Sequence, residues 1–277
     1  MHSSRLMTPG AKVLLGLLLC PGLVFSGLTL VAAGQAAPRP GERSKEKSGE
    51  NDPARFEEAK KWIARSVSAY GGEERLAGIT DLSFASESAG PQGHPVKFKV
   101  YYKGTDRFRS EVSGSDFFAM TIVNGPSAWL KSEQTLIELT ASDTEPLKIS
   151  TQLQSQPYDI FDRLTKFWAE GERSIEGVRY LVIGTSGFLG KNFARGEISL
   201  DSQTFLVRRF EYEEEVETKQ GRGVNKFDMR YEDYRAFGGI QFPTRVRSNQ
   251  PGAASTITFS DFKVNPGVPD SFFEKPH

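Results

Sequence analysis

The stretch "FLVRRFEYEEEVETKQGRGVNKFDMRYEDY", Phe205 to Tyr234, alternates apolar and charged residues on both sides of a glycine-containing turn. Successive side chains of a β-strand point to opposite faces of a sheet, so this alternation separates two faces. The apolar face would carry Leu206, Phe210, Tyr212, Val216, Phe227, Met229 and Tyr231. The other face would carry Arg209, Glu211, Glu213, Glu215, Lys226, Asp228, Arg230 and Glu232. The stretch therefore predicts a long antiparallel hairpin with one aromatic and one charged face.

The same period of two recurs from Asp81 onward in short segments separated by Gly, Pro, Asn and Asp. The clearest segments are "VKFKVYY", "DRFRSEV", "FFAMTIV", "YLVIGT", "ARGEISL" and "STITFSDFKV". A large antiparallel sheet accommodates many such strands and can leave one face in water. Because 277 residues are within the range of one large β domain, we expect a single mainly β (α+β) fold.

Two helices are predicted to cover the apolar face of this sheet. The first has apolar residues at helical spacing, Phe56, Ala59, Ile63, Val67 and Tyr70. Asp52 and Pro53 favour its start, Gly71 and Gly72 favour its end, and "EERLAGI" adds a turn after it. The second helix is predicted from Tyr158 to Ala169, where Ile160, Phe161, Leu164, Phe167 and Trp168 form an apolar stripe.

The segment "YRAFGGIQFPTRV", Tyr234 to Val246, places a proline inside a predicted strand. Gly238 and Gly239 can adopt the positive φ angles of a two-residue hairpin loop. Pro243 then lies in the returning strand, and proline cannot donate a hydrogen bond to a sheet. We expect Pro243 at an open margin or at a bulge, and an open margin exists only in an unclosed barrel.

The N-terminus predicts export. After Arg5 and Lys12, the chain is apolar from Val13 to Ala33, and "VAAGQAA" offers small residues for cleavage. We therefore expect a signal peptide over 1–36, a flexible polar linker over 37–52 and one domain over 53–277. The alternative is an uncleaved inner-membrane anchor, since about 20 apolar residues can span a bilayer. Cys20, the only cysteine, follows leucine rather than a small residue, so no lipidation is predicted.

The composition excludes several classes of function. The net charge is zero, with 35 basic and 35 acidic residues, whereas nucleic-acid binders usually carry a basic excess. The three histidines, His2, His94 and His277, have no metal-ligand spacing, and the usual base for a Ser or Cys nucleophile is missing. "GTSGFLGK" lacks the spacing of a phosphate-binding loop and is interpreted as a turn between strands. We expect no metal, no cofactor and no enzyme activity.

Five motifs, in this order, resemble the outer-membrane lipoprotein-sorting proteins of the periplasmic lipoprotein carrier (LolA-like) superfamily. They are "YGGEERLAGITDL", "VYYKGTDRFRSEV", "IVNGPSAWL", "YEDYRAFGGIQFPTRV" and "ITFSDFKVNPGVPDSFFEKP", and the resemblance covers Phe56 to Pro276. It implies an unclosed β-barrel in the periplasm, whose helices form a lid over a hydrophobic cavity for acyl chains, without covalent catalysis. By position it makes Trp129 a contact on the sheet and Phe272 or Phe273 a C-terminal plug.

One departure from the superfamily concerns the lid. Where the best-known carriers have an arginine that holds the lid shut, this chain has Gly104, with Arg107 and Arg109 nearby. Lid control by that arginine is therefore not expected here.

The aromatic residues lead to two functional hypotheses. The chain has 20 Phe, 8 Tyr and 3 Trp, which fit either a plain core or a core that leaves an acyl-chain cavity. The candidate cavity residues are Phe98, Val100, Tyr102, Trp129, Phe161, Leu164, Trp168, Phe210, Tyr212, Phe227, Met229 and Tyr231, with the Tyr158–Ala169 helix as lid. The first hypothesis is a monomeric exported carrier of lipid or lipoprotein acyl chains. The second is a membrane-tethered interaction or sensor module that contacts envelope membrane proteins.

Overall fold

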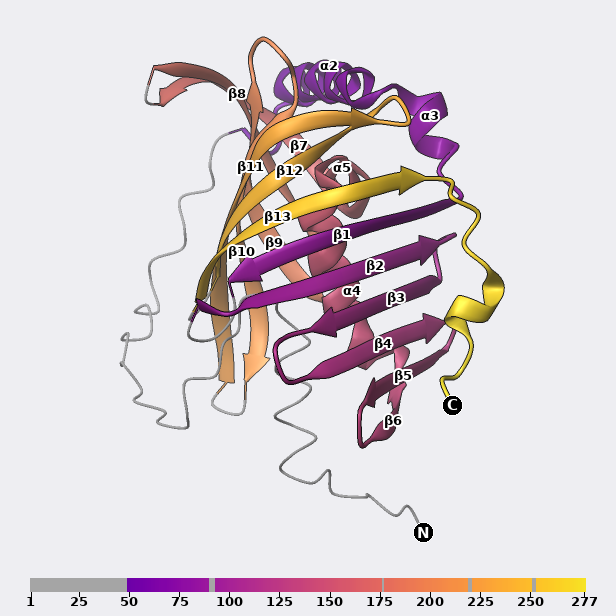
Figure 1. Cartoon of the computed structure of the whole chain (residues 1–277). Helices are drawn as coiled ribbons and strands as arrows, with labels where there is room; N and C mark the ends of the chain where they lie inside the picture. Colours follow the sequence, from indigo (N-terminus) through magenta and orange to yellow (C-terminus); the bar gives the residue numbers. More distant parts are fainter. Residues whose placement is uncertain (1–48, 90–92, 176, 219–220, 251–252) are drawn as a thin grey trace.

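The computed structural model describes residues 49–89, 93–175, 177–218, 221–250 and 253–277. Its main feature is one antiparallel sheet of 13 strands in the order β6-β5-β4-β3-β2-β1-β13-β12-β11-β10-β9-β8-β7 (Figure 1). The strands are β1 (Asp81–Ala89), β2 (Pro95–Lys103), β3 (Arg107–Ser113), β4 (Phe118–Asn124), β5 (Ser127–Ser132), β6 (Leu136–Thr140), β7 (Leu164–Ile175), β8 (Val178–Leu189), β9 (Asn192–Asp201), β10 (Val207–Thr218), β11 (Gly221–Phe237), β12 (Ile240–Gln250) and β13 (Ala253–Val264). The sheet is curved but not closed, with β6 and β7 at its two ends. The predicted unclosed, mainly β fold is confirmed.

The hairpin of β10 and β11 is present with the predicted faces. Phe210 lies opposite Met229 and Tyr212 opposite Phe227, so the aromatic residues share one face. The rings of Phe210 and Tyr212 stack with centroids 4.6 Å apart, as do those of Tyr212 and Phe227. On the other face, Lys226 lies opposite Glu213 with 2.7 Å between the charged atoms. This exposed pair stabilises the hairpin little.

The first predicted helix is confirmed as α2 (Pro53–Tyr70), and the added turn as α3 (Glu73–Ala77). The Asp52 carboxylate caps α2 by accepting the Ala54 N–H at 2.9 Å. Gly71 ends it with φ of 134°, a conformation that favours glycine. The buried side of α2 includes Trp62, which lies outside the predicted apolar stripe. The helix packs against β7 and β12 at the top of the sheet (Figure 1).

The second predicted helix is wrong over most of its length. Only a short helical segment exists there, η2 (Pro157–Asp159) followed by α5 (Ile160–Arg163), and Leu164 already begins β7. The apolar residues from Leu164 to Ala169 are compatible with either structure, because aromatic side chains also favour strands. Pairing with β8 satisfies the backbone of this segment, and this pairing is a long-range contact that the local pattern does not contain.

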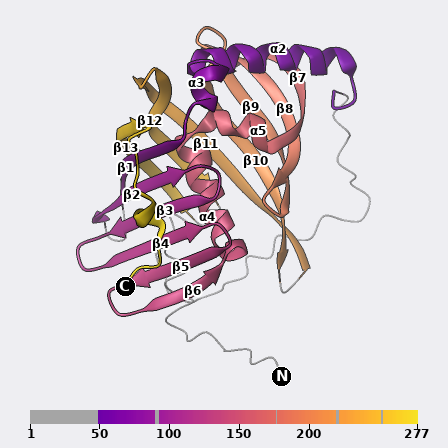
Figure 2. The same cartoon turned by 90° about the vertical axis from the view of Figure 1, so that its right-hand side faces the viewer.

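The main internal helix is instead α4 (Ala141–Ser155), which was not predicted. Figure 2 shows it crossing the concave side of the curved sheet. Its buried apolar residues are Leu147, Ile149 and Leu153, too few for a clear amphipathic stripe. Pro146 inside the helix further hides it from sequence patterns.

Strand register defines the two faces of the sheet. Phe84, Val100 and Ser110 are paired in one row across β1, β2 and β3, and they line a space with Leu147 and Thr151 of α4. This side is called the concave face. Their neighbours point the other way, because successive side chains of a strand alternate. The row Tyr101, Arg109, Ile122 and Trp129 therefore belongs to the opposite, outer face.

Pro243 does not lie at an open margin. Pro243 lies in β12 and pairs with Tyr234 of β11. Strand β12 has a neighbour on each side, β11 and β13, so it is not an edge strand. The β12–β13 pairing begins only at Arg245, so the proline nitrogen is not in a ladder with β13. Asp233, next to Tyr234 on β11, has a positive φ of 54°. The predicted hairpin before it is present, with Gly238 and Gly239 at φ of 57° and 79°.

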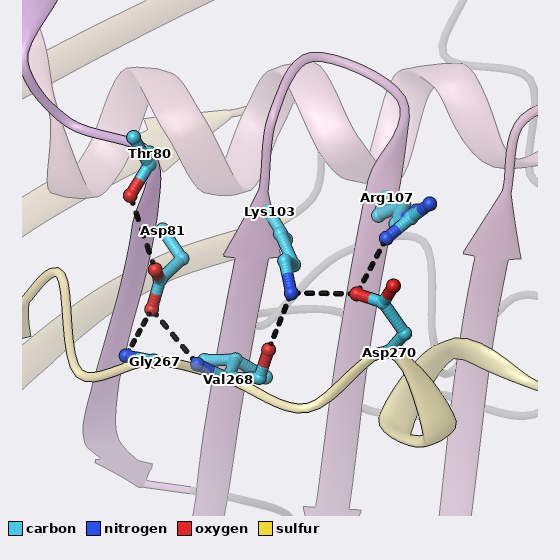
Figure 3. A network of polar contacts seen from close by, with 7 residues as sticks. All are labelled: Thr80, Asp81, Lys103, Arg107, Gly267, Val268 and Asp270. Atoms are coloured by element: carbon cyan, nitrogen blue, oxygen red, sulfur yellow. Dashed lines mark hydrogen bonds and ion pairs between the residues drawn. The ribbon is translucent and has the colours of Figure 1, made fainter.

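The C-terminal segment is fastened to the outer face by a polar network (Figure 3). The Asp81 carboxylate accepts the backbone N–H groups of Gly267 at 2.9 Å and Val268 at 3.1 Å. The Lys103 ammonium donates to the Val268 carbonyl at 2.8 Å and pairs with Asp270. Arg107 pairs with the same Asp270 oxygen at 2.7 Å.

Beyond this network, η3 (Asp270–Phe273) brings the Phe273 ring into a buried cluster with Met120, Ile122 and Val268. Arg109 donates to the Phe272 carbonyl at 3.0 Å. Of the two residues that the resemblance implies as a C-terminal plug, Phe272 and Phe273, the second is fully buried.

The predicted signal or anchor over 1–36 lies outside the described residues, as does most of the predicted linker. Its last residues, from Gly49, are described and are packed: Glu50 accepts from Arg195 at 2.7 Å. Within the described ranges, no helix is both long and apolar enough to cross a membrane.

Candidate functional site: the concave face beneath α4

The concave face is lined by aromatic and aliphatic side chains, and α4 fills most of the space in front of it. Two small cavities remain beside the helix. One of ≈ 20 Å³ lies between Leu147 of α4 and the side chains of β1, β2, β3 and β13. The other, of ≈ 150 Å³, lies between Ile149 of α4 and the β8–β9 turn, with Tyr212 and Phe227 in its wall. Ligand pockets usually measure about 300–1,000 Å³, so neither of these two cavities beside α4 has room for a long acyl chain.

Most of the predicted cavity residues lie on or beside the concave face. They are Phe98, Val100, Tyr102, Phe161, Leu164, Phe210, Tyr212, Phe227, Met229 and Tyr231. Phe98 and Val100 line the smaller cavity, and Tyr212 and Phe227 line the larger one. Phe161 of α5 contacts Phe167 of β7 edge-on, with centroids 6.1 Å apart.

The two predicted tryptophans lie elsewhere. Trp129 is on the outer face, packed against the cluster beneath the C-terminal segment. Trp168 is opposite Gly184, in a row that continues to Glu197 and Glu211 on the charged outer face. A Cβ atom on Gly184 would lie 2.3 Å from the Trp168 ring, so the glycine makes room for it. Each tryptophan alternates with inward neighbours, and the local pattern does not say which of two adjacent apolar residues faces inward.

Four contacts hold α4 in place. At its N-terminus, the Thr140 N–H donates to the Asp143 carboxylate at 2.8 Å. Near its middle, the Lys148 ammonium donates to the Thr105 carbonyl in the β2–β3 turn. At its C-terminal end, the buried Tyr231 hydroxyl donates to the Leu153 carbonyl at 2.9 Å, and Arg163 donates to Gln152.

The Lys148 contact bears on the expected absence of a lid arginine. Thr105 directly follows Gly104, the position where the resemblance leads one to look for that arginine. Here the cation comes from the helix and the acceptor from the turn. Burial, followed by the nearby Arg163 charge, lowers the pKa of Lys148. The arginines near Gly104 are engaged elsewhere, since Arg107 and Arg109 hold the C-terminal segment.

The inner side of α4 is largely polar. Thr144, Thr151, Gln154 and Ser155 are buried along with the three apolar residues. The Thr151 hydroxyl donates to the Leu147 carbonyl at 2.8 Å, and the Ser155 hydroxyl to the Thr151 carbonyl at 2.8 Å. These bonds are made within the helix, so they do not tie it to the sheet. α4 therefore covers an aromatic surface with side chains that match it poorly.

On the sheet, a buried hydroxyl of β2 also faces α4. The Tyr102 hydroxyl is buried near Thr151 and has no hydrogen-bond partner of normal geometry among the described residues. A buried hydroxyl without a partner costs about 1–3 kcal/mol.

The site offers little acid–base chemistry. The main titratable groups are tyrosines, and burial raises the pKa of Tyr102, Tyr158 and Tyr231. At the larger cavity, burial raises the pKa of Glu214, against a hydrogen bond from Asn192. Among the residues described, no group of three or more His, Cys, Asp or Glu side chains could hold a metal ion. The concave face therefore offers apolar surface rather than metal or acid–base chemistry.

Comparison with known proteins gives structural matches only. No protein-family model and no curated protein matches the chain. The chain is similar to a DUF1329 family protein from Desulfovibrio piger, at 17% identity and a TM-score of 0.48, over 78% of this chain and 97% of that one. It is similar to a LolA superfamily protein from Nitrosomonas europaea, at 15% identity and a TM-score of 0.46, over 78% of this chain and 97% of that one. It is also similar to the Mycobacterium tuberculosis lipoprotein LppX, at 14% identity and a TM-score of 0.30, over 79% of this chain and 98% of that one.

Proposed function

We propose that this chain is an exported protein that binds the acyl chains of a lipid or lipoprotein on the concave face, in the place that α4 occupies here. One observation carries the proposal: an aromatic concave face is covered by a helix whose buried side has four polar and three apolar residues, with the Thr151 and Ser155 hydroxyls bonded to the helix backbone. To leave the sheet, such a helix gives up three buried apolar side chains and the hydrogen bonds that join it to Thr105 and Tyr231. The exposed face would then accept a flexible apolar ligand without covalent chemistry.

The free energy of docking α4 on the concave face is comparable to that of binding an acyl chain there. Burying Leu147, Ile149 and Leu153 stabilises the docked helix by roughly 1.5–3 kcal/mol each, or about 5–9 kcal/mol together. A long acyl chain gains about 0.8 kcal/mol per CH₂, which reaches on the order of 10 kcal/mol before the loss of its own freedom. Exchange of helix for ligand is therefore close to balanced. α4 thus replaces the segment Tyr158–Ala169 as the proposed lid.

A second candidate is a tethered interaction or sensor module that carries no lipid. The small size of the cavities favours it, because ≈ 20 and ≈ 150 Å³ leave the concave face filled by the chain itself. In that case α4 would be a permanent part of the core. The N-terminal run would remain as the anchor, and the outer face would meet the partner.

The test is ligand binding with two variants at neighbouring positions on opposite faces. The protein from Pro38 onward is extracted with organic solvent for mass spectrometry and is titrated with a fluorescent long-chain fatty acid. Phe98→Asp places a charge in the smaller cavity and should abolish binding, whereas Lys99→Asp, on the outer face, should leave it unchanged. A protein that is empty after extraction and does not bind the fatty acid would reject carriage and favour the tethered module. Sequencing the mature N-terminus separates a free carrier from an anchored protein.

A further inference from the structure

The exposed apolar side chains are concentrated at one end of the strands. Antiparallel pairing brings the β3–β4, β5–β6, β8–β9 and β10–β11 turns to the same side of the sheet, called the rim. Among the described residues, eight large apolar side chains are exposed. Five of them are at the rim: Phe118, Leu136, Phe188, Phe193 and Val224. At the opposite strand ends, the exposed large apolar side chains among the described residues are Ile175 and Val178 of the β7–β8 hairpin.

The β8–β9 hairpin has the largest of these features. Phe188 and Phe193 form a cross-strand pair with ring centroids 5.6 Å apart and are 58% and 36% exposed. Beyond them lie one more residue pair, Leu189 and Asn192, and the turn of Gly190 and Lys191. Both rings point away from the concave face, because the adjacent Leu189 and Ala194 belong to the main core. Two phenylalanines at a hairpin tip with one side in water are not needed for the core.

The same turn forms the wall of the larger cavity. Leu189, Gly190, Lys191 and Asn192 line it opposite Glu145, Pro146 and Ile149 of α4. Lys191 and Glu145 are exposed, so the cavity opens to solvent at the rim. The exposed phenylalanines therefore flank the place where a ligand would enter beneath α4.

The rim residues are distributed in a way that fits a lipid surface better than a protein. Phe118 belongs to the β6 side of the sheet, whereas Phe188 and Phe193 belong to the β7 side. Protein interfaces usually have a contiguous apolar centre. Separate apolar tips around an opening can all enter the deformable interfacial layer of a bilayer, where Phe and Leu side chains insert readily.

We propose that the rim docks onto the interfacial layer of a lipid bilayer, with the Phe188–Phe193 hairpin and Phe118 inserted, so that the cavity beneath α4 faces the membrane. The inference rests on the proposed function, because docking would let acyl chains pass between the bilayer and the concave face without crossing water. Its test is independent, because docking is measured on vesicles and ligand binding in buffer without vesicles.

The charges at the rim predict which membranes bind. Asp116 and Glu133 lie at the β3–β4 and β5–β6 turns, and Lys191 lies at the β8–β9 turn. With both signs present, attraction to anionic lipids is not the driving force. Binding should therefore occur on neutral phosphatidylcholine and should persist at high salt, since salt screens exposed charges but not apolar insertion.

The experiment is sedimentation of the protein from Pro38 onward, which contains every described element, with phosphatidylcholine vesicles. Phe188→Ser/Phe193→Ser should weaken partitioning at least about tenfold, equivalent to 1.4 kcal/mol. Adding Phe118→Ser should weaken it further. The matched control is Phe56→Ser on α2, which removes a phenylalanine of similar exposure, 41%, away from the rim and should have no effect.

Circular dichroism checks that the variants are folded, and Phe188→Trp gives a second measurement. The tryptophan keeps the apolar contact, so vesicle binding should be retained and its emission should shift to the blue. Failure of the wild-type protein to bind phosphatidylcholine, binding that requires anionic lipid, or an equal loss with Phe56→Ser would each overturn the proposal. Loss of docking with unchanged fatty-acid binding in buffer leaves the proposed function intact.

Discussion

The lid role of α4 can be tested by removing one oxygen atom. Tyr231 on β11 is 1% exposed, and its hydroxyl donates to the Leu153 carbonyl near the C-terminal end of the helix. When α4 leaves the sheet, water can bond to this carbonyl. Tyr231→Phe therefore destabilises only the docked state of the helix, and it keeps the ring on the concave face.

The size of the effect follows from the contact. A buried hydrogen bond contributes about 0.5–1.5 kcal/mol net, and a carbonyl left without a partner can cost up to about 3 kcal/mol. The free energy of unfolding should fall by about 1–2 kcal/mol. If a ligand must displace α4, the same loss raises its affinity, and 1.4 kcal/mol corresponds to a factor of ten. We expect fatty-acid affinity to rise about five- to thirtyfold.

The assay combines urea unfolding with fluorescent fatty-acid titration, and Tyr70→Phe is the matched control. The Tyr70 hydroxyl is also buried, and it contacts the Tyr234 hydroxyl at 3.0 Å and the Val207 N–H at 3.2 Å, without touching α4. This variant should lose similar stability with no gain in affinity. The reasoning is refuted if Tyr231→Phe loses stability while affinity stays constant, or if both variants bind more tightly, which would indicate general loosening.

Three further substitutions test other contacts by urea unfolding. Phe273→Ala empties the fully buried position under the C-terminal segment and should cost about 3–5 kcal/mol; a loss below 1 kcal/mol would mean that the plug is dispensable. Gly184→Ala should displace the Trp168 ring, costing about 1–3 kcal/mol and shifting tryptophan emission, whereas unchanged emission would contradict the close contact. The side-chain and backbone hydrogen bonds from Thr140 lower the pKa of Asp143, so its cap stabilises the protein above the ordinary aspartate pKa and is lost as pH falls through the lowered pKa. Asp143→Ala should therefore cost about 1 kcal/mol at neutral pH and progressively less in acid; a difference independent of pH would refute the cap.

The sequence was sufficient for the sheet because its signal is local. In β10 and β11 apolar and charged residues alternate, so the type of each residue predicts the face on which it lies, and the glycines mark the turn. The same holds for α2, where Asp52 and Gly71 mark the two ends. These features need no knowledge of distant contacts.

The sequence was not sufficient where the choice depends on a distant partner. Leu164, Phe167 and Trp168 satisfy the spacing of a helix as well as that of a strand, and β7 forms because β8 offers it a ladder. The faces of Trp129 and Trp168 were misassigned for a related reason. Each lies beside another apolar residue, Leu130 or Phe167, so only the register of the neighbouring strand decides which one points inward.

The failure to predict α4 has a physical cause that bears on function. A helix that is a permanent part of a core needs a continuous apolar stripe, and such a stripe makes it visible in the sequence. α4 has three buried apolar residues, and its buried Thr151 and Ser155 hydroxyls bond to its own backbone. The weak stripe that hides the helix from periodicity also limits the free energy that holds it on the sheet. A mainly polar helix on an aromatic face is the combination that an apolar ligand can displace.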